Sequence, residues 1–102
     1  MAALKQKCLL SFTDCQRLKA CKLDENTYLE PLDATTYAVR FYYTNIVLIH
    51  ADGRYTLNNG GYQTPTTKER LNRFSPVTIY QEKRQWYLND GTPFENGMVV
   101  NG

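Results

Sequence analysis

TTYAVRFYY (residues 35–43) and IVLIHADGRYTL (residues 46–57) decide the fold of this chain. Both segments are rich in β-branched and aromatic residues, which are enriched in strands. Side chains alternate between the two faces of a strand, so Val39 and Phe41 share one face and Arg40 lies on the other. The two segments therefore predict antiparallel strands with one buried face.

Asp52-Gly53 separates the last two of these strands. Asp-Gly suits a type I′ turn, because both central residues of that turn need positive φ. A two-residue turn at this point predicts that His50 lies opposite Tyr55, and Leu48 opposite Leu57.

The N-terminal part predicts a helix. Thr13-Asp14-Cys15-Gln16 has a capping-box pattern, which indicates a helix over residues 14–22 with Leu18 and Cys21 facing inward. Residues 27–29 then predict a further short strand.

A second capping-box pattern, Thr66-Thr67-Lys68-Glu69, predicts a helix over residues 67–74. Leu71 and Phe74 would anchor this helix, and Pro76 prevents it from continuing.

The remaining segments also have strand character. Residues 77–82 and 85–88 predict a hairpin about Lys83-Arg84, and residues 98–100 predict a last short strand. Ile79 would face the core.

Together these elements predict an α+β fold, with a small antiparallel β-sheet of about five or six strands and two short helices. The 102 residues suit one domain, residues 1–102, in which an N-terminal segment (residues 1–25) precedes a β-rich core (residues 26–100). The expected core residues are Val39, Phe41, Val47, Ile49, Leu71, Phe74 and Ile79.

Composition favours an ordinary globular protein, with 42% hydrophobic, 13% aromatic and 22% charged residues. We find neither an apolar run of about 18 residues nor a signal-peptide pattern, and therefore expect a cytoplasmic protein with no membrane partner. Cys8, Cys15 and Cys21 match no zinc motif or disulfide framework, which predicts free thiols and no metal or other cofactor.

Catalytic residues are not expected. His50 is the only histidine, so Cys15 with His50 is the sole nucleophile and base that the chain offers. Cysteine-nucleophile signatures are absent, and we predict no catalytic residues and a protein that is not an enzyme.

The clearest binding pattern is a Gly-rich corner followed by a helix start, which loosely resembles a phosphate-binding loop. The net charge is +2, but basic side chains are concentrated in residues 1–23 and 54–87, each with a local charge of +4. We also expect Tyr55, Tyr80, Trp86 and Tyr87 to be exposed beside them, as rings that stack on bases. The predicted anion or nucleic-acid site consists of Arg54, Gly60, Gly61, Tyr62, Thr66, Thr67, Lys68, Arg73, Lys83 and Arg84.

A motif pattern links the strands to this corner. His50-Ala51-Asp52-Gly53 reads as His-x-Asp-Gly, residues 58–62 as Asn-x-Gly-Gly-aromatic, and residues 66–72 as Thr-Thr-Lys-x-Arg-x-Asn. In this pattern the chain resembles a family of short, uncharacterised proteins encoded by bacteriophages and related mobile elements. The resemblance covers most of residues 26–100, and the first 25 residues of the chain lie outside it. The chain has Tyr62 where the family more often has tryptophan.

The resemblance implies a viral protein that acts in the cytoplasm of a host bacterial cell, and it transfers no activity. Our leading hypothesis is a non-enzymatic binding protein for an anionic partner, either a nucleic acid or a nucleotide signal. The alternative is an anti-CRISPR-like inhibitor of a host defence protein, whose acidic residues would mimic nucleic acid. Those acidic residues are Asp24, Glu25, Glu30 and Asp33. The oligomeric state stays open.

Overall fold

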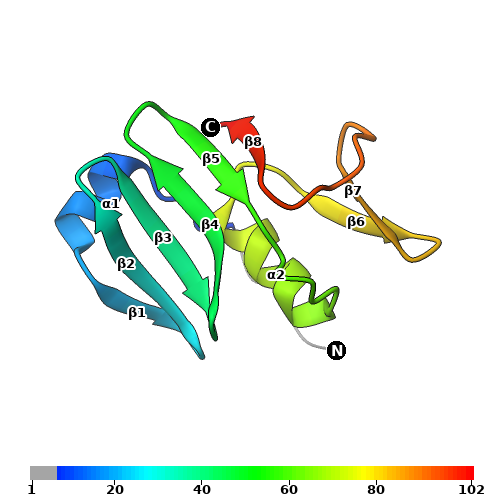
Figure 1. Ribbon diagram of the computed structural model, residues 1–102, viewed down its shortest axis with the longest axis horizontal. Coiled ribbons are helices and arrows are strands. Elements are labelled where there is room, and N and C mark those ends of the chain that lie inside the picture. Colours follow the sequence, from blue (N-terminus) through cyan, green and yellow to red (C-terminus); the bar gives the residue numbers. More distant parts are fainter. Residues whose placement is uncertain (1–6) are drawn as a thin grey trace.

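A computed structural model describes residues 7–102 (Figure 1). Its elements are α1 (Phe12–Leu18), β1 (Cys21–Asp24), β2 (Thr27–Asp33), β3 (Thr36–Phe41), β4 (Thr44–His50), β5 (Arg54–Leu57), α2 (Pro65–Phe74), β6 (Ile79–Glu82), β7 (Gln85–Leu88) and β8 (Met98–Asn101).

Six of the strands form one antiparallel sheet in the order β1-β2-β3-β4-β5-β8, and β6 pairs with β7 in a separate two-stranded sheet. The first five strands follow one another as a meander, whereas β8 returns from later in the chain to pair with β5. These sheets and the two helices confirm the predicted α+β fold.

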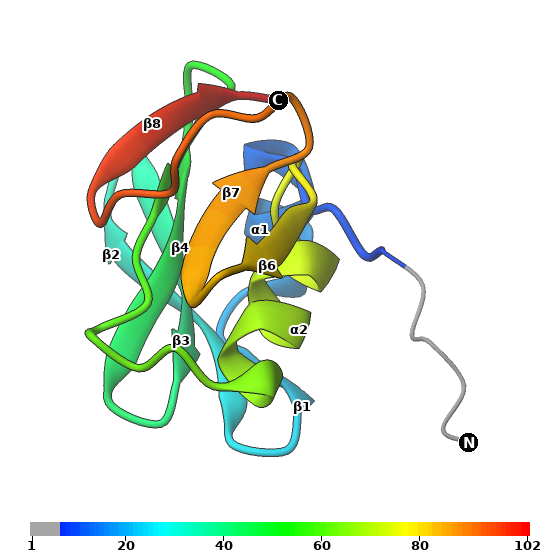
Figure 2. The same ribbon diagram turned by 90° about the vertical axis from the view of Figure 1, so that its right-hand side faces the viewer.

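The helices and the β6–β7 hairpin lie on the same side of the six-stranded sheet (Figure 2). The hydrophobic core fills the space between these two layers, and all seven core residues predicted from the sequence are buried. Alternation along β3 buries Val39 and Phe41 and leaves Arg40 half-buried on the other face, as predicted.

The predicted N-terminal helix is wrong in its bounds. Ser11, not Thr13, caps it, since the Ser11 hydroxyl accepts from the Asp14 N–H and the Asp14 carboxylate accepts from the Ser11 N–H. The helix ends at Leu18, because Lys19 adopts a φ of 61° and the chain turns back as β1. Cys15 is therefore the buried side chain, and Leu18 is exposed.

The register of the β4–β5 hairpin differs from the prediction by one residue. Val47 pairs with Leu57, and Ile49 pairs with Tyr55. The connection has three residues instead of two, and it ends at Gly53 with a φ of 91°. A three-residue loop closed by a left-handed glycine is a common hairpin alternative. Because a one-residue shift exchanges the two faces, Leu57 and Val47 lie together in the core.

Helix α2 begins two residues before its predicted start. The Thr64 hydroxyl accepts from the Thr67 N–H, and Pro65 occupies the first helical position, where its missing N–H costs nothing. Leu71 and Phe74 are buried, which confirms them as the anchors of the helix.

The two C-terminal strand predictions are confirmed. Ile79 pairs with Leu88 in the β6–β7 hairpin, and both are buried. Strand β8 includes the predicted residues 98–100 and pairs with β5 along its length.

The N-terminal segment packs against the end of α2. The Lys7 ammonium donates to three carbonyl oxygens, and the Cys8 N–H donates to the Arg73 carbonyl. The Tyr55 hydroxyl also donates to the Leu10 carbonyl, at 2.7 Å. These bonds fix residues 7–10 to the body of the domain. The three acceptors of Lys7 are the carbonyls of Asn72, Ser75 and Val77.

Candidate functional site

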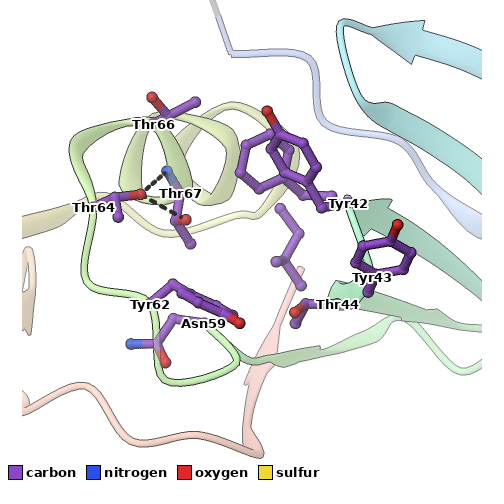
Figure 3. Close-up of a pocket in the computed structure, with 10 residues that line it drawn as sticks. Tyr42, Tyr43, Thr44, Asn59, Tyr62, Thr64, Thr66 and Thr67 are labelled. Carbon is purple, nitrogen blue, oxygen red and sulfur yellow. Dashed lines mark hydrogen bonds between the residues drawn. The ribbon is translucent and has the colours of Figure 1, made fainter.

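A pocket of about 520 Å³ opens between the β3–β4 turn and the segment that leads into α2 (Figure 3). This volume lies within the range of small-ligand sites. We call it the tyrosine pocket. Its ten lining residues are Phe41, Tyr42, Tyr43, Thr44, Ile46, Asn59, Tyr62, Thr64, Thr66 and Thr67, and none of these ten carries a charge at neutral pH.

One side of the pocket is the two-residue turn between β3 and β4. Tyr42 adopts a φ of 54°, which a turn of this length requires and which costs energy for a residue with a side chain. Its N–H donates to the Asn26 carbonyl, and its hydroxyl accepts from the Asn26 amide at 3.0 Å. Tyr42 is thus held in place, whereas the Tyr43 side chain is 97% exposed.

The other side of the pocket carries Tyr62, which is 63% exposed. Its N–H donates to the carbonyl of Asn59, a buried residue whose own N–H donates to the Asn96 side chain. Figure 3 shows the Tyr62 ring entering from this loop, opposite Tyr42 and Tyr43. The pocket therefore presents three exposed aromatic rings from two separate segments.

Gly60 joins the two sides. A Cβ atom at this position would lie 2.5 Å from the Thr44 hydroxyl oxygen, and Gly60 has a φ of 65°. Both the close approach and the left-handed backbone therefore require glycine. The neighbouring Gly61 has a φ of 85° but open space around it.

The structure does not support the phosphate cradle predicted at the Gly-Gly corner. The Gly60 N–H donates to the Asn58 side chain at 2.7 Å, and the Gly61 N–H donates to the Asn59 side chain at 2.8 Å. At the start of α2, Pro65 has no N–H, and that of Thr67 is taken by Thr64. These backbone donors are therefore not available to an anion.

The ten predicted site residues do not converge on one site. Tyr62, Thr66 and Thr67 line the tyrosine pocket. Arg54 lies at the opposite end of β5, where its guanidinium pairs with Asp52 at 2.8 Å. Gly60 and Gly61 shape the loop, and the remaining basic residues Lys68, Arg73, Lys83 and Arg84 lie on α2 and at the β6–β7 turn.

Arg73, one of the predicted anion-binding residues, is engaged by carboxylates of the protein itself. Its guanidinium pairs with Asp24 of β1 and lies 3.8 Å from Glu69. The buried Arg70 also reaches Asp24 at 3.7 Å, and it donates to the Thr27 hydroxyl at 2.9 Å. This ion-pair network ties the β1–β2 hairpin to α2.

The network also supports the floor of the tyrosine pocket. The Arg70 guanidinium lies 5.6 Å from the centre of the Phe41 ring, and that ring meets Tyr42 edge-on at 4.7 Å. A cation over the face of an aromatic ring attracts it by about 0.5–2 kcal/mol. Arg70 of α2 therefore contacts the floor of the pocket through the Phe41 ring.

The acidic residues considered for mimicry of nucleic acid interact with other groups of the protein. Asp24 pairs with Arg73, and Glu30 pairs with Arg40 at 2.9 Å. Asp33 accepts from the Thr35 N–H at 2.8 Å, and Glu25 lies 3.6 Å from Lys22. Each of these carboxylates has a partner, which gives no support to mimicry of nucleic acid by these residues.

Two of the rings expected at the surface are buried. Trp86 has no exposed area and Tyr55 is 5% exposed, because both point into the core. Tyr80 and Tyr87 do stack on the outer face of their hairpin, with ring centres 5.7 Å apart.

The pair of residues weighed for catalysis occupies two different environments. Cys15 is fully buried, and burial raises the pKa of its thiol to about 11. His50 contacts hydroxyl groups on the neighbouring strands, 2.7 Å from Thr56 and 3.5 Å from Thr36. A thiol with so high a pKa is a poor nucleophile at neutral pH.

The predicted site contains three of the ten lining residues, Tyr62, Thr66 and Thr67, and it lacks Tyr42, Tyr43, Thr44 and Asn59. One signal was present, because Tyr42-Tyr43 connects two strands without a glycine. Aromatic residues in such a turn are not explained by the turn itself.

The fold and this pocket describe a small α+β protein with a ligand-sized surface site, and comparison with known proteins adds its family. The sequence model of the Kyanoviridae Gp96 protein family matches residues 3–101, so the chain belongs to this phage protein family. The match confirms the resemblance to bacteriophage proteins and extends it to the N-terminal segment, which we had placed outside it.

No curated protein and no solved structure matches the chain. Within residues 7–102, neither helix has the length and apolar character needed to cross a membrane.

Proposed function

We propose that this phage protein is a non-enzymatic binding protein that engages single-stranded nucleic acid or a nucleotide through the tyrosine pocket. The observation that carries the proposal is the convergence of Tyr42, Tyr43 and Tyr62 on one pocket lined with threonine hydroxyls. Stacking a base on an aromatic ring contributes about 1–3 kcal/mol, and it tolerates different bases because each has a π-face.

The polar groups of the pocket suit the edge of a base. Thr66 lines one wall and is exposed, and its hydroxyl can both donate and accept hydrogen bonds. The neighbouring Thr64 and Thr67 hydroxyls bond to each other at 2.9 Å. The lining is uncharged, so we expect recognition of the base rather than of the phosphate. This differs from the predicted phosphate cradle, whose donors are occupied.

A direct test measures binding of a fluorescein-labelled, single-stranded oligonucleotide of mixed sequence by fluorescence anisotropy. Tyr62→Ala and Tyr43→Ala should each weaken binding by roughly 5- to 100-fold, which corresponds to one lost stacking contact. Their salt dependence should not change, because neither substitution removes a charge.

Leu32→Ala provides the control. Leu32 is an apolar side chain with 48% exposure, and it does not line the pocket. This variant should bind like the wild type. If the tyrosine variants also bind like the wild type, or the wild type binds no oligonucleotide or nucleoside, the proposed function is wrong.

A second candidate is a host protein as the partner. Tyrosine and asparagine, which line this neutral pocket, are among the residue types that antibody loops use to contact proteins. Affinity capture from bacterial lysate with and without nuclease separates the two. A protein that stays bound after nuclease treatment, and is lost with Tyr62→Ala, would replace nucleic acid as the partner.

A further inference from the structure

The β6–β7 hairpin carries a second feature that the tyrosine pocket does not explain. The hairpin forms its own two-stranded sheet. It extends away from the six-stranded sheet, with its turn at the far end (Figure 1). Lys83 and Arg84 are the two residues of this turn, and both side chains are exposed. We call this pair the basic tip.

The backbone of the basic tip is strained. Lys83 has a φ of 51° and Arg84 a φ of 67°. A two-residue hairpin turn of type I′ needs both values to be positive, and asparagine followed by glycine satisfies this at the lowest cost. Lysine and arginine are therefore placed where the fold alone favours other residues. Such strain in a folded protein is a reason to ask what the side chains do.

The charges of the basic tip are also unpaired. Within residues 7–102, neither Lys83 nor Arg84 takes part in an ion pair, although Glu82 is adjacent in the chain. By contrast, Arg17, Arg40, Arg54, Arg70 and Arg73 all pair with carboxylates. The tip thus presents two available cations at a projecting point.

We propose that the basic tip binds the phosphate backbone of a nucleic acid strand. The stacked pair of Tyr80 and Tyr87 lies behind the tip on the outer face of the hairpin, and Tyr80 is 41% exposed. Cations beside flat aromatic rings suit a nucleic acid strand better than an acidic protein surface. The partner class rests on the proposed function, but the site and its chemistry are separate from those of the pocket.

An abasic oligonucleotide, which has phosphates and sugars but no bases, tests the tip without the pocket. Binding is measured by fluorescence anisotropy at 50 and 200 mM salt. Arg84→Gly should weaken it roughly five- to tenfold at 50 mM salt and reduce the salt slope by about 0.7. The double variant Lys83→Asn/Arg84→Gly should reduce the slope by about 1.4.

The same substitutions should stabilise the fold. Glycine removes the steric cost of a left-handed residue, so the melting temperature of Arg84→Gly should rise by roughly 4 °C or more. A gain in stability together with a loss of binding would show that the tip is kept for its charge.

Lys19→Gly is the matched control. Lys19 is also a lysine at positive φ, 61°, without an ion pair among the described residues, but it follows α1. This variant should melt higher and bind the abasic strand like the wild type. Equal weakening by Lys19→Gly and Arg84→Gly would mean general electrostatic attraction and would overturn the proposal.

Other outcomes separate this inference from the proposed function. Failure of the abasic strand to bind at 50 mM salt overturns the tip proposal, even if free nucleosides bind the pocket. Tighter binding of a polyglutamate peptide than of the abasic strand also overturns it, in favour of an acidic protein. Loss of abasic binding on Arg84→Gly supports it, even if nucleosides fail to bind and the pocket proposal falls.

Discussion

Asp24 of β1 forms an ion pair with Arg73 near the end of α2, and both side chains are only 18% exposed. The pair connects the first hairpin of the sheet to the helix that backs the tyrosine pocket. It also explains why a cation that looks free in the sequence is not available to a ligand. Its main contribution is structural.

Asp24→Asn should therefore destabilise the fold. The substitution leaves the guanidinium groups of Arg70 and Arg73 close together without their shared carboxylate, and we expect a loss of about 2–3 kcal/mol in the free energy of unfolding. Urea denaturation followed by the fluorescence of Trp86, the single tryptophan, measures it. Glu25→Gln, which alters an exposed pair with Lys22, should change stability little. Equal effects of the two variants would contradict the importance of the network.

Substitutions at the Gly-Gly corner should separate backbone strain from close packing. Gly61→Ala adds only the cost of a left-handed alanine, about 1–2 kcal/mol. Gly60→Ala adds the same cost and a collision with Thr44, so it should destabilise the fold further and disturb the pocket. Thermal denaturation of both variants measures the difference. Adding Thr44→Ala to Gly60→Ala should recover part of the loss, and no recovery would contradict the contact.

The three thiols should react at different rates. Cys8 is exposed, Cys21 is half-buried, and Cys15 is buried with its pKa raised to about 11. At pH 8, a chromogenic disulfide reagent should modify Cys8 first and Cys15 only on unfolding. Cys8→Ser should remove the fast phase, and Cys15→Ser should leave it unchanged. A fast reaction of Cys15 in the folded protein would contradict its place in the core.

Acid should weaken the fold through carboxylates whose pKa is lowered. The hydrogen bond from Arg40 lowers the pKa of Glu30, and the Thr35 N–H lowers that of Asp33. A pKa that is lower in the folded state contributes stability above the pKa of the unfolded chain, and this is lost as pH falls through the folded value. Melting temperature should therefore fall below about pH 5. Glu30→Gln should flatten this fall, and an unchanged pH profile would count against the pair.

The local sequence pattern predicted most of the fold, because the alternation of side chains along a strand and the pairing of strands in a hairpin depend on residues that are close in sequence. It was less successful at element ends. The sequence before α2 offers two possible helix starts, one at Thr64-Pro65 and one at Thr66-Thr67-Lys68-Glu69. The structure uses the first, because the Thr64 hydroxyl accepts from the Thr67 N–H. The β4–β5 register failed for a similar reason, since Asp-Gly also fits a three-residue loop.

The candidate site was harder to predict because it depends on contacts between distant segments. Tyr62 belongs to the predicted site and lines the pocket, but Tyr42 and Tyr43 join it only through the approach of Gly60 to Thr44. The free or paired state of each cation likewise depends on tertiary neighbours. Arg73 and Lys83 are both predicted anion-binding cations, but among the described residues only Arg73 forms an ion pair with a carboxylate.

The pairing of β8 with β5 affects the order in which the domain assembles. Strands β1 to β5 pair with their sequence neighbours, whereas Arg54 of β5 meets Asn101 of β8 across a loop that contains α2 and the β6–β7 hairpin. Closing such a loop costs chain entropy before any contact compensates for it. We therefore expect the five-stranded meander to form first and β8 to dock last, so that amide hydrogens of β8 exchange with solvent sooner than those of β3 and β4.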